Sequence, residues 1–291
     1  MFEKVLFPTD FSPDSQRILG YVKDIPGVKK VILLHVVDAT HPSRRGWEYG
    51  PHIENAKILM EENRQTLSKN GIQADVIIET IVSTITQGDM PLTILEKADV
   101  EGVSLIVMGA RGRNTIQSIL LGSVSANVVR HAHTPVLLMR FPPASRMAGE
   151  QSSLFSRVIV PIDFSGPSLD ALTFLKAIPA AGQVILLNVV DRGESEEEIR
   201  AAVSKAKERL FGIGRDLAAS GIRTEPMVHV GYPPEEICAT ADRISTTLIL
   251  MSPQGEGWTR ELRALFIGST TNTVMRNAHC PVLITAAQKT A

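Results

Sequence analysis

The sequence predicts two α/β domains in tandem, each built around a parallel sheet. Three observations support this fold class. The chain has 291 residues, and a single domain usually has about 150. Motifs of the first half return in the second half in the same order. Within each half, short β-branched runs alternate with amphipathic stretches, which is typical of parallel strands connected by helices.

Matching segments define the repeat. The pairs are Lys4–Leu19 with Arg157–Leu172, Val31–Asp38 with Val184–Asp191, Leu105–Gly112 with Leu248–Gly255, and Gly122–Met139 with Gly268–Thr285. The repeated unit is far longer than the roughly 20–50 residues of a solenoid repeat, so it is a whole domain. We therefore expect domains at 1–142 and 155–287. They are joined by a linker at about 143–154, in a stretch rich in Pro, Ser, Ala and Gly.

The elements of the first domain follow from its local sequence. Apolar, β-branched runs predict strands at Val5–Pro8, Val31–Val37, Ala74–Ile78, Leu105–Met108 and Pro135–Met139. Amphipathic stretches predict one helix after the N-cap Ser12 and others at about Asn55–Asn70, Leu92–Val100 and Ser123–His131. Because continuous apolar strands are buried on both faces, helices should cover both sides of the sheet.

Composition disfavours several function classes. The formal net charge is -1 and no basic block stands out, so neither nucleic acid nor a membrane surface is an expected partner. Cys238 and Cys280 are far apart in sequence, which argues against a disulfide framework and fits a reducing cytoplasm. No apolar run has the roughly 18 residues that span a bilayer, and the N-terminus resembles a strand and turn rather than a signal peptide.

The stretch MGARGRNTIQSILLGS, from Met108 to Ser123, has the chemistry of an anion site. Glycines allow backbone N–H groups to approach phosphate oxygens, and a helix that follows offers unpaired N–H groups and the positive end of its dipole. If the strand order is 3-2-1-4-5, this stretch lies beside Thr9–Ser12, where the order reverses. Ligands of open α/β sheets bind at such a point.

The glycine spacing, G-x2-G-x9-G-S, differs from the P-loop and Rossmann fingerprints. Together with the preceding LIVM, the opening VLFPTDFS and the segment ILLHVVD, it resembles the universal stress protein (UspA-like) family, and the resemblance covers both halves. The resemblance implies doubly wound, Rossmann-like domains, related to the adenine-nucleotide α-hydrolases. Each would have a five-stranded parallel sheet of order 3-2-1-4-5. Some family members bind ATP at this place and others do not, and the glycine motif marks those that bind.

Carried onto this sequence, the resemblance implies a nucleotide site in the first domain. Asp10 would contact the adenosine part, Val36 would bind adenine through its backbone, and Pro8 and Thr9 would shape the turn. The residues implied on the ribose and phosphate side are Met108, Gly109, Gly112, Gly122, Ser123 and Val124. Arg111 and Arg113 vary in the family's pattern, so a phosphate role for them rests on their charge alone.

The second domain should bind nucleotide weakly or differently. Ser252 replaces the first glycine, Pro253 brings no N–H group, and Glu256 replaces an arginine, in a loop three residues longer. The residues of this weaker second site are Asp163, Val189, Gly268 and Ser269. A rebuilt loop that uses Arg260 or Arg263 for the phosphates is the alternative.

Other interpretations stay open for several residues. Asp10 could only cap the following helix, and His35 fits a hydrogen-bonded core histidine. His131 and His133 lack a third ligand, so no metal site is predicted. The segment Asp38–Ile53 could be a lid or partner surface, or equally a solvent loop.

The expected function is a cytoplasmic stress-response protein whose bound ATP or AMP sets a state that an unknown protein partner recognises. No enzyme activity is expected beyond slow ATP hydrolysis, because no catalytic triad, nucleophile elbow or acidic pair for Mg²⁺ is present, although Mg²⁺ could arrive with the nucleotide. The alternative is a nucleotide-free interaction module of the same fold. An ATP pyrophosphatase is disfavoured, because PTDFSPDS lacks the glycines of that phosphate loop.

The two domains are expected to pair within the chain. Their last strands, TPVLLM and CPVLIT, are apolar and would lie at a sheet edge, which proteins cover. Family dimers cover this edge by pairing the strand with its copy, and here the copy is on the same chain. Whether two such chains form a homodimer is left open.

Overall fold

The computed structural model describes residues 1–38, 49–81, 90–110, 121–141, 153–178, 181–255 and 267–286. The chain divides into two compact units, Met1–Leu137 and Leu138–Ala291. Each unit is described by itself.

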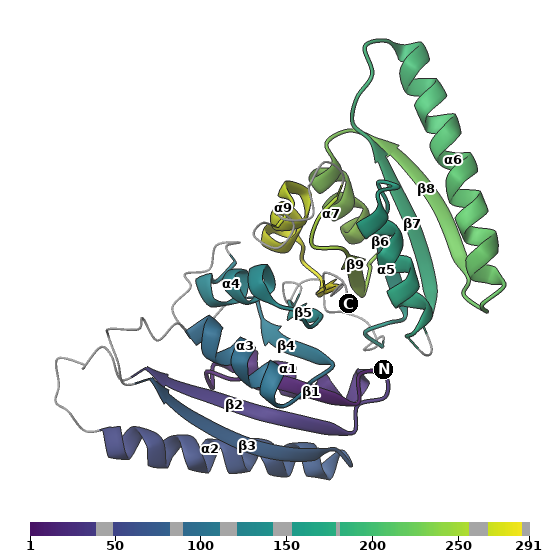
Figure 1. The fold of residues 1–291 in the computed structure, drawn as a ribbon. Helices are drawn as coiled ribbons and strands as arrows, with labels where there is room; N and C mark the ends of the chain where they lie inside the picture. Colours follow the sequence, from purple (N-terminus) through teal and green to yellow (C-terminus); the bar gives the residue numbers. More distant parts are fainter. Residues whose placement is uncertain are drawn as a thin grey trace. The chain divides into compact units, whose positions relative to one another are not determined.

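The first unit alternates strands and helices (Figure 1). Its elements are β1 (Lys4–Pro8), α1 (Pro13–Leu19), the short 3-10 helix η1 (Val22–Asp24), β2 (Lys30–Asp38), α2 (Tyr49–Lys69), β3 (Gln73–Ile81), α3 (Met90–Val100), β4 (Leu105–Gly109), α4 (Ser123–His131) and β5 (Val136–Met139), within which the unit boundary falls. The strands follow the order β3-β2-β1-β4-β5. β1 runs parallel to both neighbours, with Val5 opposite Val31 and Leu105.

The second unit repeats this plan (Figure 1). Its elements are β6 (Arg157–Pro161), α5 (Gly166–Lys176), β7 (Gln183–Val190), α6 (Glu196–Ala218), β8 (Thr224–Val230), α7 (Pro233–Arg243), β9 (Leu248–Met251), α9 (Ser269–Asn277) and β10 (Val282–Ile284). The strands follow the order β8-β7-β6-β9-β10, and β6 runs parallel to β7 and β9.

The order 3-2-1-4-5, expected for each half, is therefore found within each unit. The finer expectation, two separate five-stranded sheets, is not confirmed. The coarser expectation, a parallel α/β fold in each half, is confirmed.

The central strands supply the core of each unit. Val5, Leu6 and Phe7 of β1 are fully buried, as are Val158, Ile159 and Val160 of β6. Burial of one such side chain contributes about 1.5–3 kcal/mol relative to exposure. The core therefore fixes the central strands and, with them, the positions of the residues that follow their C-terminal ends.

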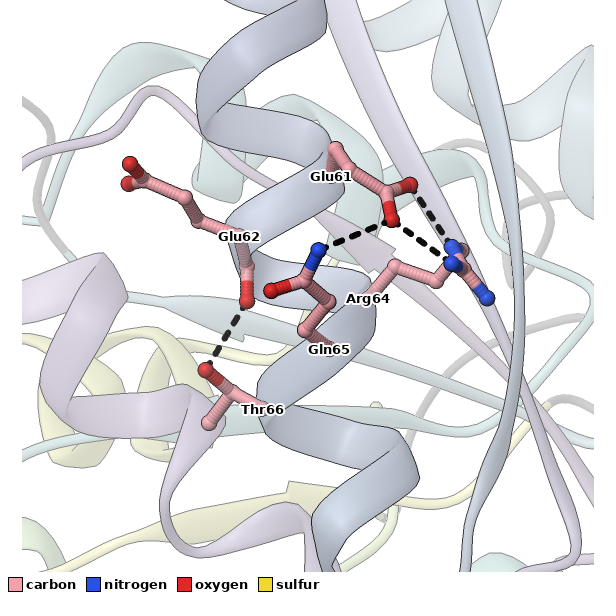
Figure 2. Close-up of polar contacts among 5 residues, drawn as sticks. All are labelled: Glu61, Glu62, Arg64, Gln65 and Thr66. Atoms are coloured by element: carbon pink, nitrogen blue, oxygen red, sulfur yellow. Dashed lines mark hydrogen bonds and ion pairs between the residues drawn. The ribbon is translucent and has the colours of Figure 1, made fainter.

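Hydrogen bonds connect neighbouring residues on the polar face of α2 (Figure 2). The carboxylate of Glu61 accepts hydrogen bonds from Arg64 Nε at 2.7 Å, Arg64 Nη2 at 2.6 Å and Gln65 Nε2 at 3.2 Å. Thr66 Oγ1 donates to the carbonyl of Glu62 at 2.9 Å. These contacts join residues three or four positions apart, which face the same side of a helix.

Candidate functional site

The strand order places the candidate site of the first unit at the ends of β1 and β4. These neighbouring strands are parallel, so the residues after Pro8 and after Gly109 emerge at the same edge of the sheet. This edge, at the reversal of strand order, is where open α/β sheets bind ligands. Among the residues assigned to the site from sequence, Arg111, Gly112 and Arg113 lie outside the described residues.

The turn between β1 and α1 is held by short polar side chains. Thr9 is buried; its Oγ1 lies 2.6 Å from Ser15 Oγ and accepts a hydrogen bond from Phe11 N at 3.1 Å. Phe11 has a φ of 57°, in the left-handed region that L-residues rarely occupy. Such strain persists only where surrounding contacts fix the backbone, and the contacts of Thr9 do so here.

Asp10 takes part in the same turn. Its Oδ1 accepts from Ser12 N at 3.0 Å, and Ser12 Oγ in turn caps α1 by accepting from Ser15 N at 3.2 Å. The N-cap of α1 is therefore Ser12, and Asp10, for which helix capping is the alternative interpretation, holds the turn just before the cap. This contact does not exclude a ligand contact, because Asp10 is only partly buried.

His35 on β2 holds the turn from the other side. Its Nδ1 lies 2.8 Å from the carbonyl oxygen of Thr9, and because a carbonyl can only accept, Nδ1 donates the proton. The ring of Phe11 packs on the imidazole at a centroid distance of 4.4 Å. In the second unit, Asn188 Nδ2 donates to the carbonyl of Ile162 at 2.7 Å. The carbonyl after the first strand thus receives a side-chain hydrogen bond in both units, from two different residue types, which supports a structural role for His35.

Val36, the next residue of β2, is 9% exposed, and Met108 at the end of β4 is 5% exposed. Both are strand residues, so a ligand at the sheet edge would meet mainly their backbone. The family resemblance implies a backbone contact for Val36, and its place near the C-terminal end of β2 is compatible with that contact.

The chain between β4 and α4 is anchored at both of its described ends. Ser125 Oγ donates to the carbonyl of Gly109 at 2.8 Å, and Gly122 N donates to the carbonyl of Ala110 at 2.8 Å. Gly122 is the N-cap of α4, with φ -65° and ψ 148°, and no side chain caps the helix in the described part of the chain. The N–H groups of the first turn, which begins at the exposed Ser123, therefore have no partner within the helix.

The second unit reproduces this framework. Asp163 Oδ1 accepts from Ser165 N at 2.9 Å and from Ser165 Oγ at 2.5 Å, and Phe164 has a φ of 64°. Thr271 Oγ1 donates to the carbonyl of Ser252 at 3.0 Å, and Gly268 N donates to that of Pro253 at 2.9 Å.

The remaining second-site residues lie on the same framework. Val189 is partly buried on β7, Gly268 is the N-cap of α9, and Ser269 is its exposed first residue.

Sequence reasoning missed two features of these sites. The hydroxyls of Ser125 and Thr271 each connect a helix to the end of a strand. These two residues occupy equivalent positions in the repeat, and that equivalence could have identified them from the sequence. Arg209 on α6 lies over the ring of Phe164, with its guanidinium carbon 3.9 Å from the ring centroid. No pattern in the sequence links these two residues, because packing of α6 brings them together.

The structure gives further observations on reactive groups. Among the described residues, no group of three or more His, Cys, Asp and Glu side chains is arranged to hold a metal ion. His131 Nδ1 lies 3.0 Å from the carbonyl of Asn127. Burial raises the pKa of the Cys238 thiol to about 11 and that of Cys280 to about 12, so both thiols are protonated near neutral pH.

Two further expectations concern segments and membranes. Most of the segment Asp38–Ile53, the possible lid, lies outside the described residues. None of the described helices combines the length and the apolar character needed to cross a bilayer.

Comparison with known proteins completes the description. The profile of the Universal stress protein family matches residues 1–140 and 154–286. Universal stress protein Slr1230 of Synechocystis sp. is 25% identical over 289 residues, covering 96% of this chain and 88% of that protein. Universal stress protein MJ0577 of Methanocaldococcus jannaschii is 31% identical over 163 residues, covering 48% of this chain and 96% of that protein.

A solved structure resembles the whole chain as well. The crystal structure of a universal stress protein from Archaeoglobus fulgidus has a TM-score of 0.70 and 27% sequence identity, covering 98% of this chain and 97% of that one. Since the family profile matches twice and the two matches span most of the sequence, the chain belongs to the universal stress protein family and carries its domain in tandem.

Proposed function

We propose that the first unit binds an adenine nucleotide, ATP or AMP, at the C-terminal ends of β1 and β4. The observation that carries this proposal is the start of α4. Gly122 caps the helix without a side chain, the N–H groups of the first turn lack intrahelical partners, and the dipole adds positive charge there. These are the properties of a phosphate site at a helix N-terminus.

The other described residues fit the rest of a nucleotide. The rigid turn of Thr9 and Asp10 would hold the adenosine part, and the backbone of Val36 would meet the base. Gly109 and Met108 would lie on the ribose side, and Gly122, Ser123 and Val124 on the phosphate side. Arg111 and Arg113 would add positive charge, and Mg²⁺ would arrive with a triphosphate.

The proposed role is regulation rather than catalysis. Bound nucleotide would set a state of this cytoplasmic protein that a partner recognises during stress, and hydrolysis would be slow. The nucleotide would therefore act as a ligand.

Calorimetry on Gly122→Val tests the proposal. Valine is a poor N-cap and places methyl groups where the phosphates would approach, so one or two charge-assisted hydrogen bonds should be lost, at about 1.5–3 kcal/mol each. Binding of ATP should weaken at least tenfold. Gly268→Val, the same change at the N-cap of α9, is the matched control and should leave the tight site nearly intact, with circular dichroism confirming that both variants fold.

Native mass spectrometry separates this proposal from the nucleotide-free alternative. An adenine nucleotide that copurifies with the chain supports nucleotide binding. A chain that carries none, and that gives no heat on titration with ATP, would refute it and leave the interaction module as the function of this fold.

A further inference from the structure

The chain after β9 folds inward in the second unit. Ser252 Oγ donates to the carbonyl of Gln254 at 2.7 Å, which closes a turn around Pro253. Ser252 is 8% exposed and Gln254 is 5% exposed. We call Ser252–Gln254 the latch. Its closing bond needs a hydroxyl at position 252, and the first unit has Gly109 at the equivalent place, so it cannot form this bond.

The latch is anchored to α9 by two hydrogen bonds. Gly268 N donates to the carbonyl of Pro253 at 2.9 Å, and Thr271 Oγ1 donates to the carbonyl of Ser252 at 3.0 Å. Together with the Ser252–Gln254 bond, these contacts fix the latch on its own residues and on the helix whose N-terminus would receive phosphates. The latch and the start of α9 therefore form one connected piece.

The latch brings Gly255 against Asp163. A Cβ at position 255 would lie 2.4 Å from Asp163 Oδ2, closer than real Cβ atoms come, so an added side chain would require this carboxylate or the chain to shift. The other oxygen, Oδ1, accepts from the backbone N and the Oγ of Ser165. Both oxygens of Asp163 thus meet the protein itself. This carboxylate is the counterpart of Asp10, which the proposed function assigns to adenosine.

We propose that the latch keeps the second nucleotide site closed, and that this contact of Asp163 with Gly255 must open before an adenine nucleotide can bind there. The inference rests on the proposed function, since it concerns the same ligand at the equivalent edge. The first unit has no hydroxyl to close such a turn. A ligand that binds only the open state must supply the free energy of opening. Its apparent affinity is therefore its affinity for the open state multiplied by the fraction of chains in which the site is open.

The first test removes the hydroxyl in a chain whose first site is disabled. In the Gly122→Val background, Ser252→Ala should bind ATP at least tenfold more tightly than Gly122→Val alone, as measured by calorimetry. Ser220→Ala, at an exposed serine after α6, is the control and should change nothing.

Hydrogen exchange provides a readout that does not depend on nucleotide. Measured by NMR, the amide of Gly268 should exchange at least tenfold faster in Ser252→Ala than in the wild type, while the amide of Gly122 keeps its rate. Unchanged exchange at Gly268 would refute the latch. Faster exchange without a gain in ATP binding would refute its role in closing the site.

The outcomes for the wild-type chain separate the two proposals. A wild type that binds ATP in both units refutes the latch and leaves the proposed function intact. A wild type that binds no ATP refutes the proposed function, whereas the exchange rate of Gly268 still tests whether the latch holds the turn closed.

Discussion

At the residue scale, equivalent positions of the two units can carry different side chains that make the same contact. His35 and Asn188 differ in size and ring character, yet each donates one hydrogen bond to the carbonyl of the residue that follows the first strand of its unit. Two residues after this carbonyl, each turn also has an exceptional backbone, with φ 57° at Phe11 and 64° at Phe164. The donor N–H, rather than the side chain that carries it, is therefore the requirement at this position.

This requirement predicts the effects of substitutions at His35. His35→Asn should keep the thermal stability of the chain close to that of the wild type, because asparagine supplies the same N–H group. His35→Leu should lower the free energy of unfolding by about 1–3 kcal/mol, since it leaves the carbonyl of Thr9 without this donor. Thermal unfolding followed by circular dichroism measures both variants.

Equal losses of stability in the two variants would contradict this interpretation. Such a result would mean that packing of the imidazole against Phe11, at a centroid distance of 4.4 Å, matters more than the hydrogen bond.

Elements could be predicted from the sequence where their pattern is local. β1 and α4 have the expected bounds to within one residue, because an apolar run and a glycine N-cap mark them directly. Gly71, expected to end the helix before β3, has a φ of 74°, a conformation that glycine adopts at low cost. α2 begins at Tyr49, earlier than expected, and β3 extends beyond Ala74–Ile78 at both ends. Strand pairing and helix packing decide those limits, and a local pattern does not contain them.

The candidate sites show the same division. The turn after β1 and the start of α4 could be located from the repeat and from glycine spacing. The latch could not, because it depends on the direction in which one hydroxyl, that of Ser252, points within a three-residue turn. The substitution of glycine by serine was visible in the sequence, but its consequence was expected to be a loss of binding groups rather than a new contact.

The hydrogen bonds on the polar face of α2 predict how the stability of the folded state depends on pH (Figure 2). The hydrogen bonds and positive charge of Arg64, with a further bond from Gln65, lower the pKa of Glu61 from 4.5 to about 2. A depressed carboxyl pKa stabilises the folded state at pH values above 4.5. That contribution is lost as the pH falls toward 2. In an NMR titration, the carboxyl of Glu61 should have its midpoint near 2, and Arg64→Ala should move this midpoint toward 4.5.

A midpoint of Glu61 that does not move when Arg64 is replaced would show that the pair is not formed in solution. The stabilisation itself should be small, since exposed ion pairs are screened by water and salt.

At the scale of the whole molecule, the two copies of the domain share the same framework but differ in the residues at the sheet edge where a ligand would bind. The turn after the first strand and the bond from the strand end to the next helix are present in both units. The residues at the end of the fourth strand of each unit differ, with Ser252 and Pro253 in place of Gly109 and Ala110. A duplication of this kind allows one copy to bind a ligand while the other takes a different role.

We expect one adenine nucleotide per wild-type chain. Native mass spectrometry at increasing ATP concentration should show a dominant one-to-one complex, and a two-to-one complex should become dominant only when Ser252 is replaced by alanine. Two nucleotides at comparable affinity in the wild type would contradict this asymmetry. The pairing of the two domains within the chain stays a prediction, and the observed mass addresses only the open question of whether two chains form a homodimer.

The bond between Ser252 and Gln254 also has a consequence for the shape of the response. Two open sites in one chain could be coupled, and coupled sites can give a sigmoidal binding curve. A chain whose second site is held shut has no second ligand to couple within it, so its occupancy should rise hyperbolically as the nucleotide concentration rises. One hydroxyl would then make the chain a graded sensor of adenine nucleotide rather than a threshold device.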